Sequence, residues 1–290
     1  MKSKIPLFVS EVSSNHARDL QRCFDFVESS VKIGCDAVKF QLFKIDELFA
    51  PEILAASEKH RERKQWELPE EYIPLIAEKC RECGIGFSCT PFYLGAVGIL
   101  SPYVDFFKIA SYELLWDDLL ISCAATGIPI VLSTGMANVA EISHAVETLR
   151  GAGCVDLTLL HCVSGYPTPS CQANLSAIEL LKKKFSCKIG WSDHTVQEGV
   201  VQRAVHRYEA EMIEFHLDLD AQGVEFANGH CWLPEQAAQM IRNVRVGCGA
   251  DGAGTKEPVE AELSDRDWRV DPEDGLRPMK YVRKSWTIRV

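Results

Sequence analysis

Two histidines in the sequence have the spacing of ligands that share one metal ion. His194 lies near the end of residues 190–195, which follow a short apolar stretch typical of a β-strand. His216 closes the next strand-like run, residues 212–216, one strand-and-helix unit later. Neutral imidazoles at the ends of adjacent strands can bind one divalent ion. We therefore predict a metal site with His194 and His216 as ligands.

Other chemically active side chains also follow strand-like runs, and in a parallel barrel the carboxyl ends of the strands face the active site. Lys39 and Lys108 are on such strands, and a buried lysine costs several kcal/mol unless an anion pairs with it. They predict a bound phosphate or carboxylate, or else a pairing with carboxylates such as Glu11 and Glu113. The other residues at these ends include Asn15, His16, Gln41, Thr90, Ser111, Ser133, Thr134, Gly135, His161, Ser164, Tyr166, Ser192, Asp193 and Glu214.

Eight apolar runs of strand length alternate with amphipathic helical stretches, a pattern that indicates a parallel sheet. Eight such units in about 250 residues predict an α/β protein with a (β/α)8 TIM-barrel fold. An open doubly wound sheet is the alternative, but residues 11–16 lack its glycine fingerprint. The predicted strands are residues 6–10, 37–41, 86–89, 106–110, 129–133, 157–162, 188–191 and 212–216, and the predicted helices are residues 20–33, 70–83, 94–100, 115–126, 140–151, 175–185, 198–209 and 234–246.

Residues 1–246 are expected to form the catalytic barrel. Within them, the charged residues 44–68 follow the second strand and predict either a solvated helix and loop or a lid over the site. Beyond residue 246 the sequence becomes rich in glycine, proline and charge. Residues 247–290 are therefore expected to form a tail packed on the barrel, without a second domain.

The 290 residues include 31 basic and 41 acidic ones, giving a net charge of −10. Such a chain is a poor candidate for binding nucleic acid or an anionic membrane. The sequence shows neither a signal peptide nor an apolar run of membrane-spanning length, so we expect a soluble cytoplasmic protein. The twelve cysteines are scattered along the chain and are expected to be reduced. Cys80 and Cys83 form a CxxC pair without the second pair that a zinc knuckle needs.

The order of several segments resembles the sialic acid synthase (N-acetylneuraminate synthase) family, enzymes that condense phosphoenolpyruvate with an N-acyl amino sugar. The resemblance covers most of residues 7–286, and six segments in the same order, each at a strand end, make it specific. A later segment, residues 256–258, is similar to the family's end-of-barrel sequence. The six segments are Lys39-Phe40-Gln41, Thr90-Pro91-Phe92, Lys108-Ile109-Ala110-Ser111-Tyr112-Glu113, Ser133-Thr134-Gly135-Met136, His161-Cys162-Val163-Ser164-Gly165-Tyr166-Pro167-Thr168-Pro169 and Gly190-Trp191-Ser192-Asp193-His194-Thr195.

The resemblance implies a reaction and a role for each matching residue. Carbon 3 of phosphoenolpyruvate would attack the aldehyde of an aldose or N-acyl amino sugar, giving a 2-keto-3-deoxy sugar acid and phosphate. A manganese or magnesium ion at His194 and His216 would stabilise the developing oxyanion, with Glu11 or Glu113 as the base. A homodimer is the assembly that the family suggests. Lys39, Lys108, Ser111, Ser133 and Ser192 would hold phosphoenolpyruvate, Gln41, Glu113 and Tyr166 would contact the sugar, and Ser164 would line the same substrate site.

The sequence departs from the family mainly where the sugar binds. Residues 15–18 lack the family's usual glycine, Phe215 replaces a lysine, and Ala227 falls at the family's sugar-binding aspartate. Glu225 and Asn228 are candidates to replace that aspartate. The sequence also ends where the linker to the family's antifreeze-like domain would begin. We therefore expect a retained phosphoenolpyruvate site and a changed sugar site.

Three other functions remain open. A Schiff-base pyruvate aldolase would use Lys39 or Lys108 and need no metal. A non-catalytic barrel would bind a sugar or a partner enzyme, although the retained histidines and lysines argue against it. A synthase acting on phosphorylated sugars would need arginines at the acceptor end, for which Arg61 and Arg63 are candidates.

Overall fold

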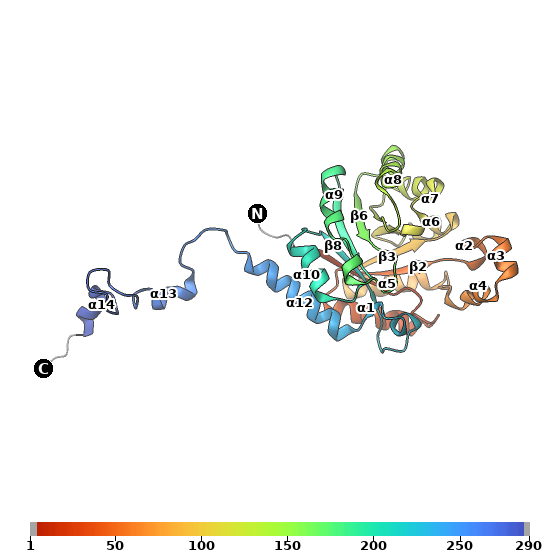
Figure 1. Cartoon of the computed structure of the whole chain (residues 1–290). Helices are drawn as coiled ribbons and strands as arrows, with labels where there is room; N and C mark the ends of the chain where they lie inside the picture. The colour runs from red at the N-terminus through yellow and green to blue at the C-terminus, as the bar shows by residue number, and fades with distance from the viewer. Residues whose placement is uncertain (1–4, 287–290) are drawn as a thin grey trace. The chain divides into compact units, whose positions relative to one another are not determined.

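The computed structural model describes residues 5–286, and its centre is a closed barrel of eight parallel strands (Figure 1). Neighbouring strands pair in sequence order, and β1 also pairs with β8, which closes the barrel. The predicted (β/α)8 fold is thus confirmed. A short strand, β9, extends the sheet beside β8 and was not predicted. The strands are β1 Leu7–Glu11, β2 Ala37–Leu42, β3 Gly86–Pro91, β4 Phe106–Ile109, β5 Ile130–Ser133, β6 Leu157–Cys162, β7 Lys188–Asp193, β8 Met212–Leu217 and β9 Cys231–Trp232.

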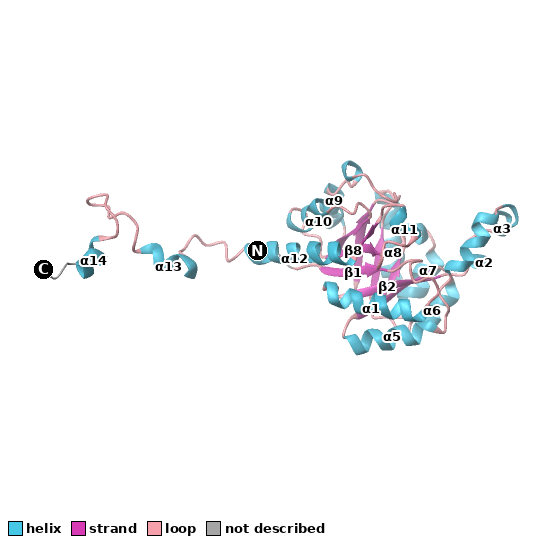
Figure 2. Cartoon of the chain, turned by 90° about the horizontal axis from the view of Figure 1, so that it is seen from below, coloured by secondary structure: helices cyan, strands magenta, loops and turns pink. Residues whose placement is uncertain are grey.

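Helices surround the strands, and their ends follow local sequence signals (Figure 2). Helix α1 begins after Asp19, whose carboxylate accepts a hydrogen bond from the backbone N–H of Arg22. It ends at Gly34, whose φ of 93° suits a residue without a Cβ atom. The predicted bounds of this helix are confirmed. The other barrel helices are α5 Tyr72–Cys83, α6 Leu94–Leu100, α7 Asp117–Ala124, α8 Val139–Gly151, α9 Ser176–Lys184, α10 Glu198–His206 and α12 Pro234–Ala250, and α1 itself spans Leu20–Ile33.

Side chains along each strand alternate between the helices and the barrel interior. On β1, Ser10 faces outward, because its hydroxyl lies 2.6 Å from that of Ser30 on α1. Glu11, the next residue, faces inward and pairs with Lys39 of β2. The interior therefore has an apolar layer at one end and polar side chains at the carboxyl ends of the strands. The apolar layer consists of Val9, Ala37, Val131, Leu160 and Met212.

The charged insertion after β2 folds into short helices: α2 Ile45–Leu48, α3 Pro51–Ala56, α4 Glu58–Glu62 and the 3-10 turn η1 Arg63–Trp66. Neither α3 nor α4 contains a buried residue. Arg61 donates hydrogen bonds to carbonyls of the insertion itself, and the Arg63 guanidinium lies over the ring of Phe49. Both arginines thus have partners within the insertion. The lid remains a prediction.

Helix α12 continues to Ala250, beyond the predicted end at residue 246. Residues 251–286 form a separate compact unit that contains the short helices α13 Glu260–Arg266 and α14 Lys280–Arg283. Within this unit the carboxylate of Asp271 accepts a hydrogen bond of 2.8 Å from the backbone N–H of Lys280. We propose that this segment serves as a tail rather than as a second domain.

All twelve cysteines are free, as expected. Cys80 is buried on the core-facing side of α5, beside Ile76 and Ala77, so the CxxC pair belongs to helix packing. No helix within residues 5–286 combines the length and the apolar character that crossing a membrane requires.

Candidate active site

Two buried lysines meet two buried carboxylates inside the barrel. Lys39 pairs with Glu11 and donates to the Thr90 hydroxyl at 3.3 Å. The ammonium of Lys108 lies 3.5 Å from Oε1 of Glu214. The expected pairing with Glu11 is present, whereas the partner of Lys108 is Glu214 and not Glu113. The sequence included Glu214 among the strand-end residues but gave it no role.

These four groups shift one another's protonation because they share a water-poor interior. Burial lowers the pKa of Lys39 to about 8, although the charge of Glu214 opposes this effect. Burial alone would raise the pKa of Glu214, but Lys108 and Lys39 outweigh it and hold that pKa below its usual value. Glu214 is therefore ionised at neutral pH. A bound anion would favour the charged form of Lys39 in the same way.

Both carboxylate oxygens of Glu11 have partners within the barrel. Its Oε1 accepts hydrogen bonds from the Gln41 amide at 2.9 Å and from the backbone N–H of Ser13 at 2.8 Å, while Oε2 pairs with Lys39. The side chain is buried. Glu11 and Gln41, both predicted site residues, are therefore adjacent in the barrel.

Hydroxyl groups converge on the backbone of Gly135, just beyond β5. The Gly135 N–H donates to the Ser111 hydroxyl at 2.9 Å, and that hydroxyl lies 3.3 Å from the sulfur of Cys162. A Cβ atom at Gly135 would lie 2.4 Å from Oγ of Ser164 and 2.9 Å from Oγ of Ser111. The buried Ser164 hydroxyl has no hydrogen-bond partner within the described part of the chain. Ser133 ends β5 immediately before this region and is also buried.

Two other predicted residues, Ser192 and Glu113, lie on different elements near the buried lysines. Ser192 of β7 donates to Oε1 of Glu214 at 3.1 Å, in register with it across the β7–β8 pairing. Glu113 ends the 3-10 turn η2 Ser111–Glu113 after β4 and is buried. Burial raises the pKa of Glu113 to about 7, against the effect of Lys108. One carboxylate oxygen of Glu113 has no hydrogen-bond partner among residues 5–286. A carboxyl with this pKa can donate and accept a proton at neutral pH.

The predicted metal ligands lie beside each other, with ring centroids 5.4 Å apart. Nδ1 of His194 donates to the backbone carbonyl of Val163 at 2.7 Å, which leaves Nε2 as an unprotonated nitrogen. Burial lowers the pKa of His194 to about 3, and the neighbouring His216 adds to this effect, so the ring is neutral. The ring of Tyr166 lies 4.3 Å from that of His194. A neutral imidazole whose free nitrogen is oriented in this way, next to a second imidazole, fits a divalent metal ion.

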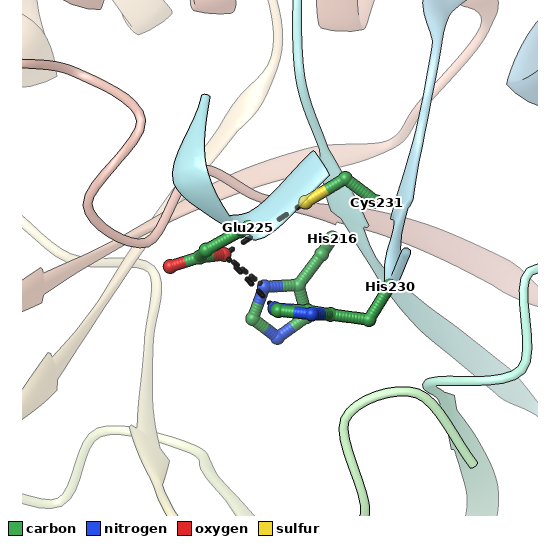
Figure 3. Close-up of side chains that lie close together, drawn as sticks. All are labelled: His216, Glu225, His230 and Cys231. Atoms are coloured by element: carbon green, nitrogen blue, oxygen red, sulfur yellow. Dashed lines mark hydrogen bonds and ion pairs between the residues drawn. The ribbon is translucent and has the colours of Figure 1, made fainter. Parts of the chain in front are cut away.

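A second cluster of donor atoms surrounds one oxygen of Glu225, on the short helix α11 Val224–Ala227 (Figure 3). Nδ1 of His216 donates to Oε2 of Glu225 at 2.8 Å, and Nε2 of His230 lies 3.5 Å from the same oxygen. The sulfur of Cys231 lies 3.8 Å from it. His230 and Cys231 were not predicted as site residues, although they are adjacent, five and six residues after Glu225, and this spacing was a usable signal.

The other oxygen of Glu225 joins α11 to the loop after β1. It accepts hydrogen bonds from the hydroxyls of Ser13 and Ser14, at 2.5 and 2.9 Å. Burial opposes its charge, but His216, His230 and these contacts hold the pKa of Glu225 well below its usual range. Glu225 is thus an ionised carboxylate engaged on both oxygens.

Asp193, one of the strand-end residues, faces the helices and organises the loop that carries His194. Its carboxylate accepts hydrogen bonds from the Thr195 hydroxyl at 2.7 Å, from the Trp232 indole at 3.0 Å and from the Trp191 indole at 3.2 Å. These contacts link β7 to β9 and fix the backbone next to His194. Asp193 is therefore a positioning residue.

Two other histidines near the strand ends have structural partners. Nε2 of His161 donates to the carbonyl of Ala173 at 3.0 Å, so His161 holds the loop after β6. Nδ1 of His16 accepts from the backbone N–H of Arg18 at 2.9 Å. Burial lowers the pKa of His16 to about 4, which keeps this ring neutral.

Known proteins resemble the chain in sequence and in structure. The NeuB family profile matches residues 26–256. The N,N'-diacetyllegionaminic acid synthase of Legionella pneumophila is 33% identical over 299 residues, which cover 97% of this chain and 79% of that protein. The pseudaminic acid synthase of Helicobacter pylori is 33% identical over 301 residues, which cover 98% of this chain and 83% of that protein.

Among solved structures, the N-acetylneuraminic acid synthetase of Leptospira borgpetersenii, crystallised in complex with citrate, superposes with a TM-score of 0.79. The two chains are 30% identical, and the match covers 91% of each. A relative with this identity and coverage shares more than the barrel fold. The chain therefore belongs to the NeuB family, the sialic acid synthase family that its sequence resembles, and it is an enzyme.

Proposed function

We propose that the chain condenses phosphoenolpyruvate with the aldehyde of an aldose or N-acyl amino sugar. Carbon 3 of phosphoenolpyruvate bonds to the aldehyde carbon, water adds at carbon 2, and phosphate leaves as its C–O bond breaks. The product is a sialic-acid-like 2-keto-3-deoxy sugar acid. The observation that carries the proposal is the pair of buried lysines, Lys39 and Lys108, together with the adjacent histidines His194 and His216 inside a NeuB-family barrel.

Phosphoenolpyruvate carries a phosphate and a carboxylate, and both need charged or hydroxyl donors. Lys39 and Lys108 supply the charge, and their carboxylate partners keep them ordered when no substrate is bound. The hydroxyls of Ser111 and Ser164 lie around Gly135, where the backbone approaches closely enough to exclude a side chain. We assign Ser133, which is buried at the end of β5, to the same set. We assign Ser192 to the same set because it contacts the carboxylate that pairs with Lys108.

His194 and His216 are the proposed ligands of a divalent ion, with manganese or magnesium as the expected metals. Such an ion supplies Lewis-acid stabilisation to the aldehyde oxygen as negative charge develops there. The Val163 carbonyl and the Glu225 carboxylate orient these two rings by accepting their Nδ1 protons. Asp193 stabilises the loop on which His194 is carried.

Two carboxyl groups are suited to different steps. Glu113 has a pKa near 7 and an unpaired oxygen among the described residues, which suits it to take the proton of the attacking water. Glu11 is held by Gln41 and Lys39, which suits it to position groups near the reacting carbons. Tyr166 packs against His194 and is the proposed contact to the sugar, with Gln41 and Glu113.

The acceptor is proposed to be an aldose whose recognition differs from that of N-acetylmannosamine. Ala227, at the position of the family's sugar-binding aspartate, has no polar side chain. Glu225, a candidate replacement, already binds two serines and His216. The relatives that match the chain are themselves named for different sugar acids, legionaminic and pseudaminic acid.

A phosphate-release screen tests the proposed function. Phosphoenolpyruvate and manganese are held constant while a panel of aldoses and N-acyl amino sugars is varied. At least one acceptor is expected to release phosphate, and the variant Lys108→Met is expected to release none. If no acceptor releases phosphate, the synthase proposal fails. Turnover that survives EDTA, together with a pyruvate adduct trapped by borohydride, would instead support the Schiff-base aldolase.

A further inference from the structure

The four-donor group, His216, Glu225, His230 and Cys231, has a composition that the proposed reaction does not require. One donor atom from each of these residues lies within 4.8 Å of all the others. His216 comes from strand β8, whereas the other three come from α11 and the residues around β9. Figure 3 shows the two imidazoles and the thiol around one carboxylate oxygen.

Two nitrogens, one oxygen and one sulfur form a donor set typical of zinc and of the transition metals that resemble it. Magnesium and manganese prefer oxygen-rich sites, so a neutral thiol gains little from them. Three of the four residues are buried, with His230 only 5% and Cys231 only 3% exposed, and Glu225 is partly buried. Nδ1 of His230 has no hydrogen-bond partner within residues 5–286, so Glu225 is its polar contact there. A structural role for hydrogen bonding alone does not account for this grouping.

We propose that the four-donor group binds a zinc-class divalent ion, using the His216 nitrogen that now donates to Glu225. The ligand atoms are Nδ1 of His216, a carboxylate oxygen of Glu225, Nε2 of His230 and the sulfur of Cys231. This site differs from the proposed metal site at His194 and His216, in which the ligand atom of His216 is Nε2. It goes beyond the proposed condensation and does not depend on it.

Sharing His216 makes the two sites mutually exclusive. A neutral imidazole has one protonated nitrogen and one that can bind a metal. When Nε2 of His216 binds an ion beside His194, Nδ1 keeps its proton and donates it to Glu225. When Nδ1 binds an ion in the four-donor group, Nε2 must hold the proton. A zinc-class ion at the four-donor group therefore competes with manganese at the His194–His216 pair.

The experiment compares the affinities for zinc and manganese in the full chain after chelator treatment under reducing conditions. Zinc binding is measured by calorimetry, and manganese binding by the electron paramagnetic resonance of the free ion. His230→Ala is expected to weaken zinc binding by roughly tenfold or more, since loss of even an outer-shell partner costs 10–100-fold. Manganese affinity should change by much less. In the unaltered chain, one equivalent of zinc should release bound manganese.

Cys231→Ser is the second variant. Serine is close to cysteine in size, so this variant keeps the proposal testable if His230→Ala unfolds. Cobalt substituted for zinc should show a sulfur-to-metal charge-transfer band in the unaltered chain and not in Cys231→Ser. His144→Ala removes an exposed histidine that pairs with Asp117, and it serves as the matched control. Its metal affinities should be unchanged.

Two results would overturn the proposal. Zinc affinity that is unchanged in both His230→Ala and Cys231→Ser would show that these residues are not ligands. Equal weakening of zinc and manganese in His230→Ala would show one common site rather than two competing ones. Both readouts are binding measurements, so a failure of the phosphate-release screen leaves them interpretable.

Discussion

The Lys108 ammonium lies 3.5 Å from the Glu214 carboxylate in the interior of the barrel, and both side chains are buried. The pair joins β4 to β8 across the barrel, and Ser192 of β7 binds the same carboxylate. Buried pairs of this kind contribute little net stability relative to apolar residues, but breaking one leaves an uncompensated charge. The pair is therefore expected to matter for stability mainly when one of its partners is removed.

The first prediction concerns the stability of this pair. Lys108→Met is expected to lower the free energy of unfolding by about 3 kcal/mol, because Glu214 loses its nearest cation. The double variant Lys108→Met/Glu214→Leu should recover much of that loss, since no buried charge remains there. Guanidinium denaturation of the single and double variants measures the coupling. Strictly additive losses would contradict the interpretation of a mutually compensating pair.

The second prediction concerns Glu113 and pH. Burial raises the pKa of Glu113 from 4.5 to about 7, so the folded protein keeps this proton over a pH range in which the unfolded chain has lost it. Its contribution to stability is present below about pH 4.5 and is lost as pH rises through about 7. As pH rises across that range, the free energy of unfolding should therefore fall less in Glu113→Gln than in the unaltered chain. Identical pH profiles of the two proteins would refute the raised pKa.

If Glu113 is the base for water addition, turnover should also rise with pH through the same pKa. Glu113→Gln is expected to lose turnover by roughly 100-fold or more and to lose this pH limb. The measurement is the pH dependence of kcat with saturating substrates. A variant that keeps the unaltered limb would assign that titration to another group.

The fourth prediction uses the close approach of the backbone at Gly135. Gly135→Ala would place a methyl group 2.4 Å from the Ser164 hydroxyl, so the serines must move. The KM for phosphoenolpyruvate is expected to rise at least tenfold, which corresponds to about 1.4 kcal/mol of binding. Gly98→Ala on α6 is the control, because its new Cβ atom meets nothing within 4 Å. Equal KM values for the two variants would exclude Gly135 from the phosphoenolpyruvate site.

The fifth prediction concerns the metal ligands of the proposed reaction. His194→Ala should weaken manganese binding and abolish turnover, and EDTA should inactivate the unaltered chain until manganese is restored. His161→Gln, which alters a histidine on the outer side of β6, should keep manganese affinity even if it lowers stability. Manganese affinity and turnover unaffected by His194→Ala would remove this residue from the metal site.

Much of the fold was readable from the sequence because local signals and burial agree. The two-sided apolar character of the strands requires a parallel sheet with helices outside it, and Asp19 and Gly34 mark the ends of α1. Strand alternation likewise places Lys39 and Glu11 on the inner face of the barrel. The residue types at the strand ends were therefore sufficient to locate the polar end of the interior.

The sequence by itself determined the barrel, its polar end and the residues that resemble those of a sialic acid synthase. Only the tertiary structure decided which charges meet. Lys108 pairs with Glu214 rather than with Glu113, because barrel closure brings β8 across from β4. The tertiary structure also brings Glu225, His230 and Cys231 next to His216, because β9 pairs with β8. Local propensity specifies elements, but the distance between two side chains on different elements depends on how the whole chain packs.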